Sequence, residues 1–147
     1  MESLSLLLKQ KKSIFLTANR LESRSALLII KTINQIYQKY KVHGFNLTNI
    51  HADSEFGHKA IEAEFPNIAL HIHAKGEHVS FIENGIKTIK ERSHEICHDA
   101  PYKRYSSLMT QSLVEGVVDL LNLFPSKNKI SGQMPPAMIM EGKNRFE

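Results

Sequence analysis

The stretch that decides the fold is residues 78–92, HVSFIENGIKTIKER. Apolar side chains recur there every three or four residues, which predicts one buried face of a helix. These side chains are Val79, Ile82, Ile86 and Ile89. The same spacing runs to about residue 98, and Asp99-Ala100-Pro101 then ends it, because proline marks the stop of a helix. The sequence therefore predicts a long helix with Glu83 in its first or second turn.

Strands and further helices are expected on both sides of this helix. A polar turn at residues 9–12 separates the first two apolar runs, which favours a hairpin. Pro125 closes the last helix, and residues 126–147 are expected to form a loop or extended arm. The expected strands are 4–8, 14–17, 45–50 and 68–73, the expected helices are 25–40 and 106–124, and 57–64 is a short helix or turn. This order is typical of an α/β protein.

Length and composition are those of one soluble globular domain. The chain has 147 residues, a net charge of +4, eight histidines and one cysteine. Such a charge permits contact with phosphate backbones without demanding it, and one cysteine excludes an internal disulfide. No stretch approaches the roughly 18 apolar residues of a membrane span, and the N-terminal charges follow the apolar run instead of preceding it as in a signal peptide. We therefore expect an intracellular protein, nuclear or cytoplasmic, without a membrane partner.

Asp53 and Glu83 are the candidate metal ligands. Asp53 follows an expected strand, where catalytic groups of open α/β sheets gather, and Glu83 lies 30 residues later on the long helix. Carboxylate oxygens are the ligands that Mg²⁺ prefers, and paired metals can assist phosphoryl transfer. The alternative interpretation is two solvated surface acids, since acidic residues prefer the surface.

Basic and polar residues around Glu83 are the candidate nucleic-acid contacts. Lys87 and Lys90 follow Glu83 at spacings of four and three, so the three share one helix face. Lysines on that face could meet phosphates of a DNA end. Asn84 and the loop residue Lys75 are further candidates. The alternative is an ordinary glutamate–lysine pair on a helix, and a plain loop lysine at 75.

Several short motifs resemble the catalytic core of copia-type retrotransposon integrases. Residues 78–92 are similar to the glutamate-bearing helix of that family, and His51-Ala52-Asp53-Ser54-Glu55-Phe56 is similar to its second-acid motif. The resemblance spans about residues 14–144, in the family's order and spacing. The downstream similarities are Pro101-Tyr102-Lys103-Arg104, Leu121-Asn122-Leu123-Phe124-Pro125, Ile130-Ser131 and residues 136–142.

The resemblance implies a ribonuclease H-like fold, with a mixed central sheet flanked by helices. The core would be residues 1–125, with 126–147 as a C-terminal extension or arm. It also implies DNA as partner, Mg²⁺ or Mn²⁺ held by three acids, and DNA 3′-end processing and strand transfer. Asp53 would be the second acid and Glu83 the third, with Lys87 and Lys90 on donor DNA. Integrase cores commonly dimerise, so a homo-oligomer is expected too.

The chain departs from the family at the first acid. Its position falls near Ser5, and no aspartate precedes Asp53. Glu2 is the only acid upstream of Ile14, and it lies before the apolar run. Without the first carboxylate a metal loses ligands, so we expect an inactive integrase-like domain.

Three functional classes therefore stay open at this point. The first is an active polynucleotidyl transferase, which would need Glu2 as its third acid. The second is a catalytically dead relic that binds nucleic acid or self-associates. The third is a small α/β protein whose acids and lysines only form its surface. Other residues could bind metal, such as His71 and His73 with His78, or His94 with His98. For these we favour a less buried strand face and a surface helix, and Cys97 has no evident nucleophile partner.

Overall fold

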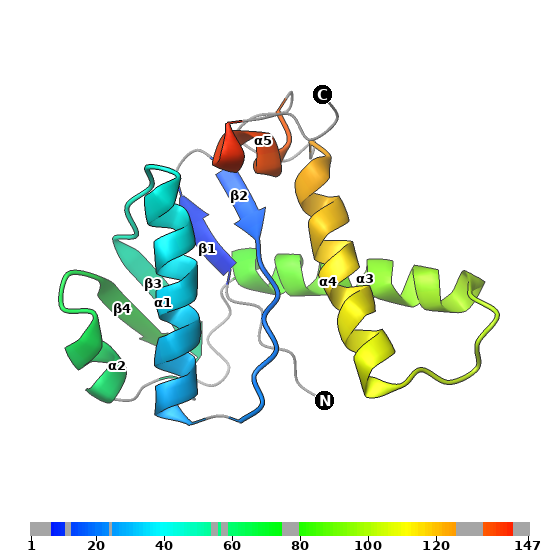
Figure 1. The fold of residues 1–147 in the computed structure, drawn as a ribbon, viewed down its shortest axis with the longest axis horizontal. Coiled ribbons are helices and arrows are strands. Elements are labelled where there is room, and N and C mark those ends of the chain that lie inside the picture. Colours follow the sequence, from blue (N-terminus) through cyan, green and yellow to red (C-terminus); the bar gives the residue numbers. More distant parts are fainter. Residues whose placement is uncertain are drawn as a thin grey trace. The chain divides into compact units, whose positions relative to one another are not determined.

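A computed structural model describes residues 7–10, 13–23, 25–53, 56, 59–74, 80–125 and 134–142. The chain divides into two compact units. Unit 1 comprises Met1–Arg20 together with His78–Glu147, and unit 2 comprises Leu21–Glu77. Each unit is described by itself, since their positions relative to one another are not determined (Figure 1).

Unit 1 combines a hairpin with three helices. Strands β1 (Leu7–Gln10) and β2 (Ser13–Leu16) pair antiparallel, with Leu7 opposite Leu16. The predicted hairpin is therefore confirmed, although Lys9 and Gln10 extend the first strand into the expected turn. Helices α3 (Ser80–Asp99) and α4 (Ser107–Leu123) lie within two residues of their predicted bounds and pack on each other (Figure 1).

The core of unit 1 forms where α3, α4 and β2 meet. Its fully buried members are Leu16, Ile89, Val117 and Val118, and partly buried side chains such as Ile82 and Ile86 surround them. Burial of the helical members of this set follows from apolar side chains spaced three and four residues apart. The same spacing leaves Glu83 and Lys87 on the exposed part of α3.

A short helix in the C-terminal segment corrects one prediction. The loop or arm expected for residues 126–147 contains α5 (Pro136–Glu141), which packs against β2 and α4. Pro136 lies in its first turn, where proline's fixed φ suits a helix, and Gly142 ends it in the left-handed conformation with φ 67°. Ala137 and Met140 are buried. Burial of these side chains stabilises a helix too short to persist alone.

Unit 2 contains a parallel strand pair and two helices. Helix α1 (Ala26–Val42) precedes β3 (Asn49–Asp53), and α2 (Lys59–Glu64) precedes β4 (Ala69–His73). The strands pair parallel in the register Asn49 to Ala69 through Asp53 to His73. Gly44 follows α1 with φ 78°, a left-handed conformation that glycine commonly adopts just after a helix.

The predicted strand at residues 45–50 was displaced. Residues 45–48 are irregular, and β3 begins only at Asn49. Leu47 is nevertheless buried, and Phe45 packs edge-on against Tyr40 with ring centroids 6.3 Å apart. The apolar residues that suggested a strand therefore contribute to burial in unit 2 without belonging to the sheet.

The fold class is confirmed as α/β, but the sheets are small. The described strands form two two-stranded sheets, β1–β2 and β3–β4. A larger mixed central sheet is not seen among the described residues. Each sheet pairs two strands that are consecutive in the sequence, β1 with β2 and β3 with β4. The predicted central sheet would also need pairing between strands that are not consecutive.

Replacing Gly116 with alanine is expected to raise the free energy of unfolding by about 0.5–1 kcal/mol. Gly116 lies inside α4, and a Cβ built there meets no atom within 4 Å. Alanine would gain helix propensity without a clash. Urea denaturation measures the change, and the same substitution at Gly44 (φ 78°) should destabilise, because L side chains rarely adopt that conformation. A destabilised Gly116→Ala variant would contradict the described α4.

Candidate functional site

Asp53 is the last residue of β3 and is exposed. Ile50 and Ala52 of the same strand are buried, and side chains alternate between the two faces of a strand. Asp53 therefore shares the other face with Asn49 and His51. Its register partner across the parallel pair is His73. The prediction that Asp53 stands at the carboxyl end of a strand is confirmed.

Histidines surround this strand face. A ring nitrogen of His51 (Nδ1) lies 2.9 Å from Nε2 of His73, and His71 Nε2 lies 3.2 Å from Oδ1 of Asn49. The His51 ring is nearly parallel to those of His71 and His73, with centroid distances of 4.8 and 5.2 Å. In the short contact one nitrogen donates and the other accepts, so the pair shares a single proton between the two facing atoms.

The sequence pattern pointed to His71 and His73 but not to His51. The alternation of His71 and His73 on one strand was visible, whereas the partner from β3 depends on register. If β3 were shifted by one residue relative to β4, His51 would point to the opposite face of the sheet from His71 and His73. No local signal in the sequence sets that register. His78, the third histidine of the original group, lies outside the described residues.

Imidazoles are the nearest described neighbours of Asp53 on its strand face. They belong to His51 and His73, whereas Mg²⁺ prefers oxygen ligands. Across the described parts of the chain, no three histidine, cysteine or acidic side chains converge to hold a metal ion. Glu83 belongs to unit 1 and Asp53 to unit 2. Their joint role in binding Mg²⁺ or Mn²⁺ remains a prediction. Ser5 and Glu2, the candidates for the position of the first acid, lie outside the described residues.

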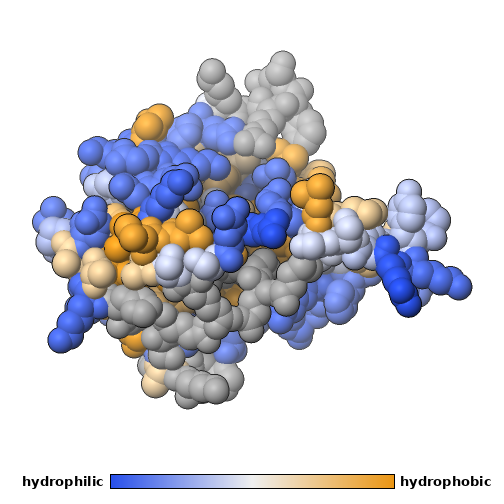
Figure 2. Space-filling model, turned by 60° about the horizontal axis from the view of Figure 1, so that its bottom comes forward, coloured by the Kyte–Doolittle hydropathy of each residue, from blue (hydrophilic) through white to orange (hydrophobic). Residues whose placement is uncertain are grey.

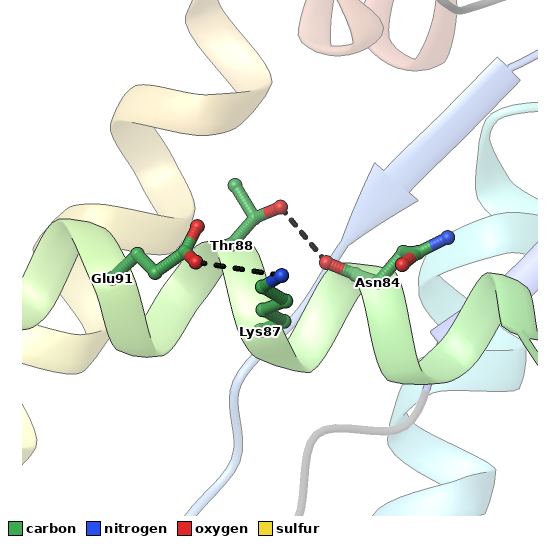
Figure 3. Close-up of polar contacts among 4 residues, drawn as sticks. All are labelled: Asn84, Lys87, Thr88 and Glu91. Atoms are coloured by element: carbon green, nitrogen blue, oxygen red, sulfur yellow. Dashed lines mark hydrogen bonds and ion pairs between the residues drawn. The ribbon is translucent and has the colours of Figure 1, made fainter.

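On α3, the predicted DNA-contact residues are all exposed. Glu83 lies in the first turn, as expected, and Asn84, Lys87 and Lys90 follow on exposed parts of the helix. Figure 3 shows Lys87 beside Glu91, with Nζ 3.8 Å from Oε1, and the Thr88 hydroxyl donating to the Asn84 carbonyl oxygen at 2.8 Å. Lys75 lies outside the described residues.

Two of the three lysine and arginine side chains of α3 form ion pairs. Lys87 pairs with Glu91 and Arg92 with Glu95, the latter at 2.7 Å. The helix carries three lysines and arginines against four acids, so it is not a basic helix as a whole. For Lys90 the described residues provide no ion pair. Exposed pairs contribute only about 0–1 kcal/mol, so phosphates could displace Glu91 from Lys87.

Near the end of α3, the other candidate groups are surface features. His98 lies 3.6 Å from Asp99, with both side chains about nine-tenths exposed. The Cys97 thiol is free and half-buried. Tyr105 donates its hydroxyl to the Cys97 carbonyl oxygen at 3.3 Å. Burial, and next the neighbouring Cys97, raise the pKa of Tyr105 above its ordinary value.

Apolar side chains interrupt the hydrophilic surface. On the face drawn in Figure 2, orange areas lie among blue ones. The large exposed apolar residues of unit 1 are Ile96, Tyr102, Leu108, Met109, Leu120, Phe124 and Met134. None of the helices in the described part of the chain combines the length and apolar character needed to cross a bilayer.

The comparisons with known proteins bear on the fold. No model of a protein family matches the sequence, and neither does any curated protein. Among solved structures, the chain is similar to the catalytic core domain of BIV integrase, with a TM-score of 0.56 and 16% sequence identity. The similarity covers 95% of this chain and 91% of that one. The chain therefore has an integrase-core-like fold over nearly its whole length.

Proposed function

We propose that this chain is an integrase-like domain that binds DNA and does not itself carry out strand transfer. The observation that carries the proposal is the likeness to the BIV integrase catalytic core across 95% of the chain. We further propose that the domain descends from a copia-type integrase. The sequence motifs around Asp53 and Glu83 support this ancestry.

The proposed loss of activity follows from the missing first acid. No aspartate precedes Asp53, and two described neighbours of Asp53 on its strand face, His51 and His73, carry imidazoles. A metal-dependent transfer needs carboxylates that converge on the ion. DNA binding does not need them, because phosphate contacts by cations supply most of the non-specific affinity.

Among the proposed DNA contacts, Lys90 is the strongest. Its ammonium group has no ion-pair partner within the described chain, whereas a phosphate must compete with Glu91 for Lys87. A self-associating relic is the second candidate. The exposed apolar residues of unit 1 favour it, because large apolar side chains are the usual core of subunit interfaces.

Lys90→Ala is expected to weaken duplex binding about threefold to tenfold and to lower the salt slope of binding by about one. Lys87→Ala should have a smaller effect, because its charge is already partly neutralised. Fluorescence anisotropy of a labelled duplex at several salt concentrations measures both. Lys31→Ala is the matched control, since Lys31 is an exposed lysine on α1 in the other unit.

Strand transfer in Mn²⁺ is tested alongside binding. We expect no joined product from the wild-type chain. Product that disappears in both Asp53→Asn and Glu83→Gln would overturn the proposed inactivity and establish a working metal site. Duplex binding that is insensitive to salt and to Lys90→Ala would overturn the proposed DNA-binding role.

A further inference from the structure

A short loop joins α3 to α4, and hydrogen bonds of Tyr105 and Ser106 hold its C-terminal end in place. It runs from residue 100 to residue 106. The hydroxyl of Tyr105 donates to the carbonyl oxygen of Cys97, in the last turn of α3. The hydroxyl of Ser106 accepts from the backbone N–H of Met109 at 3.2 Å and caps α4. These two contacts satisfy helix-end groups that lack partners within their own helices.

Tyr102 is presented to solvent by this anchored loop. Its ring contacts Tyr105 edge-to-face, with centroids 6.3 Å apart and planes 77° apart. The residue is nevertheless 59% exposed. A large aromatic ring that is supported on one side and open on the other can accept a second flat ring with little loss of side-chain freedom.

Two unopposed cations follow Tyr102 directly. Lys103 and Arg104 are exposed, and residues 100–106 contain no acid. Among the described residues neither cation has an ion pair or a hydrogen bond. On α3, by contrast, both Lys87 and Arg92 have acidic partners. Among the described residues, the loop therefore carries two cations without an acidic partner. On α3, where the sequence predicted the DNA contacts, two of the three cations have one.

We propose that residues 100–106 bind unpaired nucleotides, with a base stacked on Tyr102 and phosphates held by Lys103 and Arg104. The proposal rests on the proposed DNA-binding role and names the form of DNA that the loop selects. Bases inside a duplex have both faces covered by their neighbours, so only an unpaired or terminal base can stack on a tyrosine. Aromatic rings combined with a basic surface are the usual means of holding single strands.

A single tryptophan can report the stacking directly, because the chain has none. Tyr102→Trp places the probe at the proposed platform. Phe124→Trp is the matched control, since Phe124 is 58% exposed on the same unit and its neighbours in the sequence, Leu123 and Pro125, are uncharged. Addition of a 12-residue oligothymidylate should quench Tyr102→Trp fluorescence and leave Phe124→Trp unchanged.

Affinity measurements complete the test. For the same oligothymidylate, Tyr102→Ala should bind about tenfold more weakly, whereas Tyr102→Phe, which keeps the ring, should bind within about twofold of wild type. Relaxed closed-circular duplex DNA, which has no ends, should bind Tyr102→Ala as it binds wild type. Polyglutamate of equal charge should quench neither tryptophan.

The outcomes separate the two proposals. Duplex binding without selective quenching of Tyr102→Trp by the oligothymidylate would overturn the loop proposal and leave DNA binding intact. Selective quenching without duplex binding would overturn the proposed binding of duplex DNA by α3 and support the loop. Quenching by polyglutamate equal to that by the oligonucleotide would make the loop a general anion site and overturn base stacking.

Discussion

Replacing Asn122 with alanine is expected to lower the free energy of unfolding by about 2–4 kcal/mol. Asn122 of α4 is 3% exposed. Its Nδ2 donates to the Leu16 carbonyl oxygen at 2.7 Å, and its Oδ1 accepts the Leu16 N–H at 2.8 Å. The side chain thus pairs with both backbone groups of a buried β2 residue, as a neighbouring strand would. Alanine would leave a buried N–H and a buried carbonyl without partners, and each such group costs about 1–3 kcal/mol.

Urea denaturation and amide hydrogen exchange measure this effect. The Leu16 amide should lose protection in Asn122→Ala by more than the change in global stability accounts for. Asn84→Ala on α3 is the matched control, because Asn84 is exposed, and alanine should change its stability by less than about 0.5 kcal/mol. If Asn122→Ala unfolds at the wild-type urea concentration, α4 does not hold β2 in the way described.

Asn122 also illustrates what the sequence does not reveal about the fold. The apolar spacing around it predicted α4 correctly, because periodicity depends only on near neighbours. Its hydrogen-bond partner, Leu16, lies 106 residues away in the sequence. The local sequence therefore cannot distinguish Asn122 from a polar residue on the solvent-exposed face of a helix. The helix α5 was missed for the same reason: burial against β2 and α4 stabilises it, and its six residues carry no lasting period of their own.

The candidate site divides in the same way. Helical periodicity placed Glu83, Lys87 and Lys90 on one face of the helix, and all three are exposed on α3. It did not reveal that Glu91 would pair with Lys87, because a helix lysine has acids within reach on either side along the chain. Contacts that depend on strand register, such as that of His51 with His73, were beyond prediction from single-chain patterns. Only the resemblance to a family pointed to Asp53 as the second metal-binding acid, and that role stays a prediction.

Alkaline pH is expected to destabilise unit 2 through Tyr40. Burial raises the pKa of Tyr40 from 10.0 to about 12, and the residue is 3% exposed. The unfolded chain therefore ionises this phenol first as pH rises. Stability from the neutral buried phenol is fully present below pH 10 and is lost as pH rises toward 12. Each pH unit in that window costs up to about 1.4 kcal/mol, so the total approaches about 3 kcal/mol.

Two variants isolate this titration from that of the other alkaline groups. Tyr40→Phe removes the phenol, so its stability should decline less steeply between pH 10 and 12 than that of the wild type. Tyr37→Phe, three residues earlier on the half-buried part of α1, is the control for loss of a tyrosine hydroxyl from the same helix. Urea denaturation at each pH gives the free energies. Equal slopes for Tyr40→Phe and wild type would mean that the Tyr40 phenol ionises as readily in the folded chain as in the unfolded one. Its ring would then have to be open to water, contrary to its burial in α1, where it packs against Phe45.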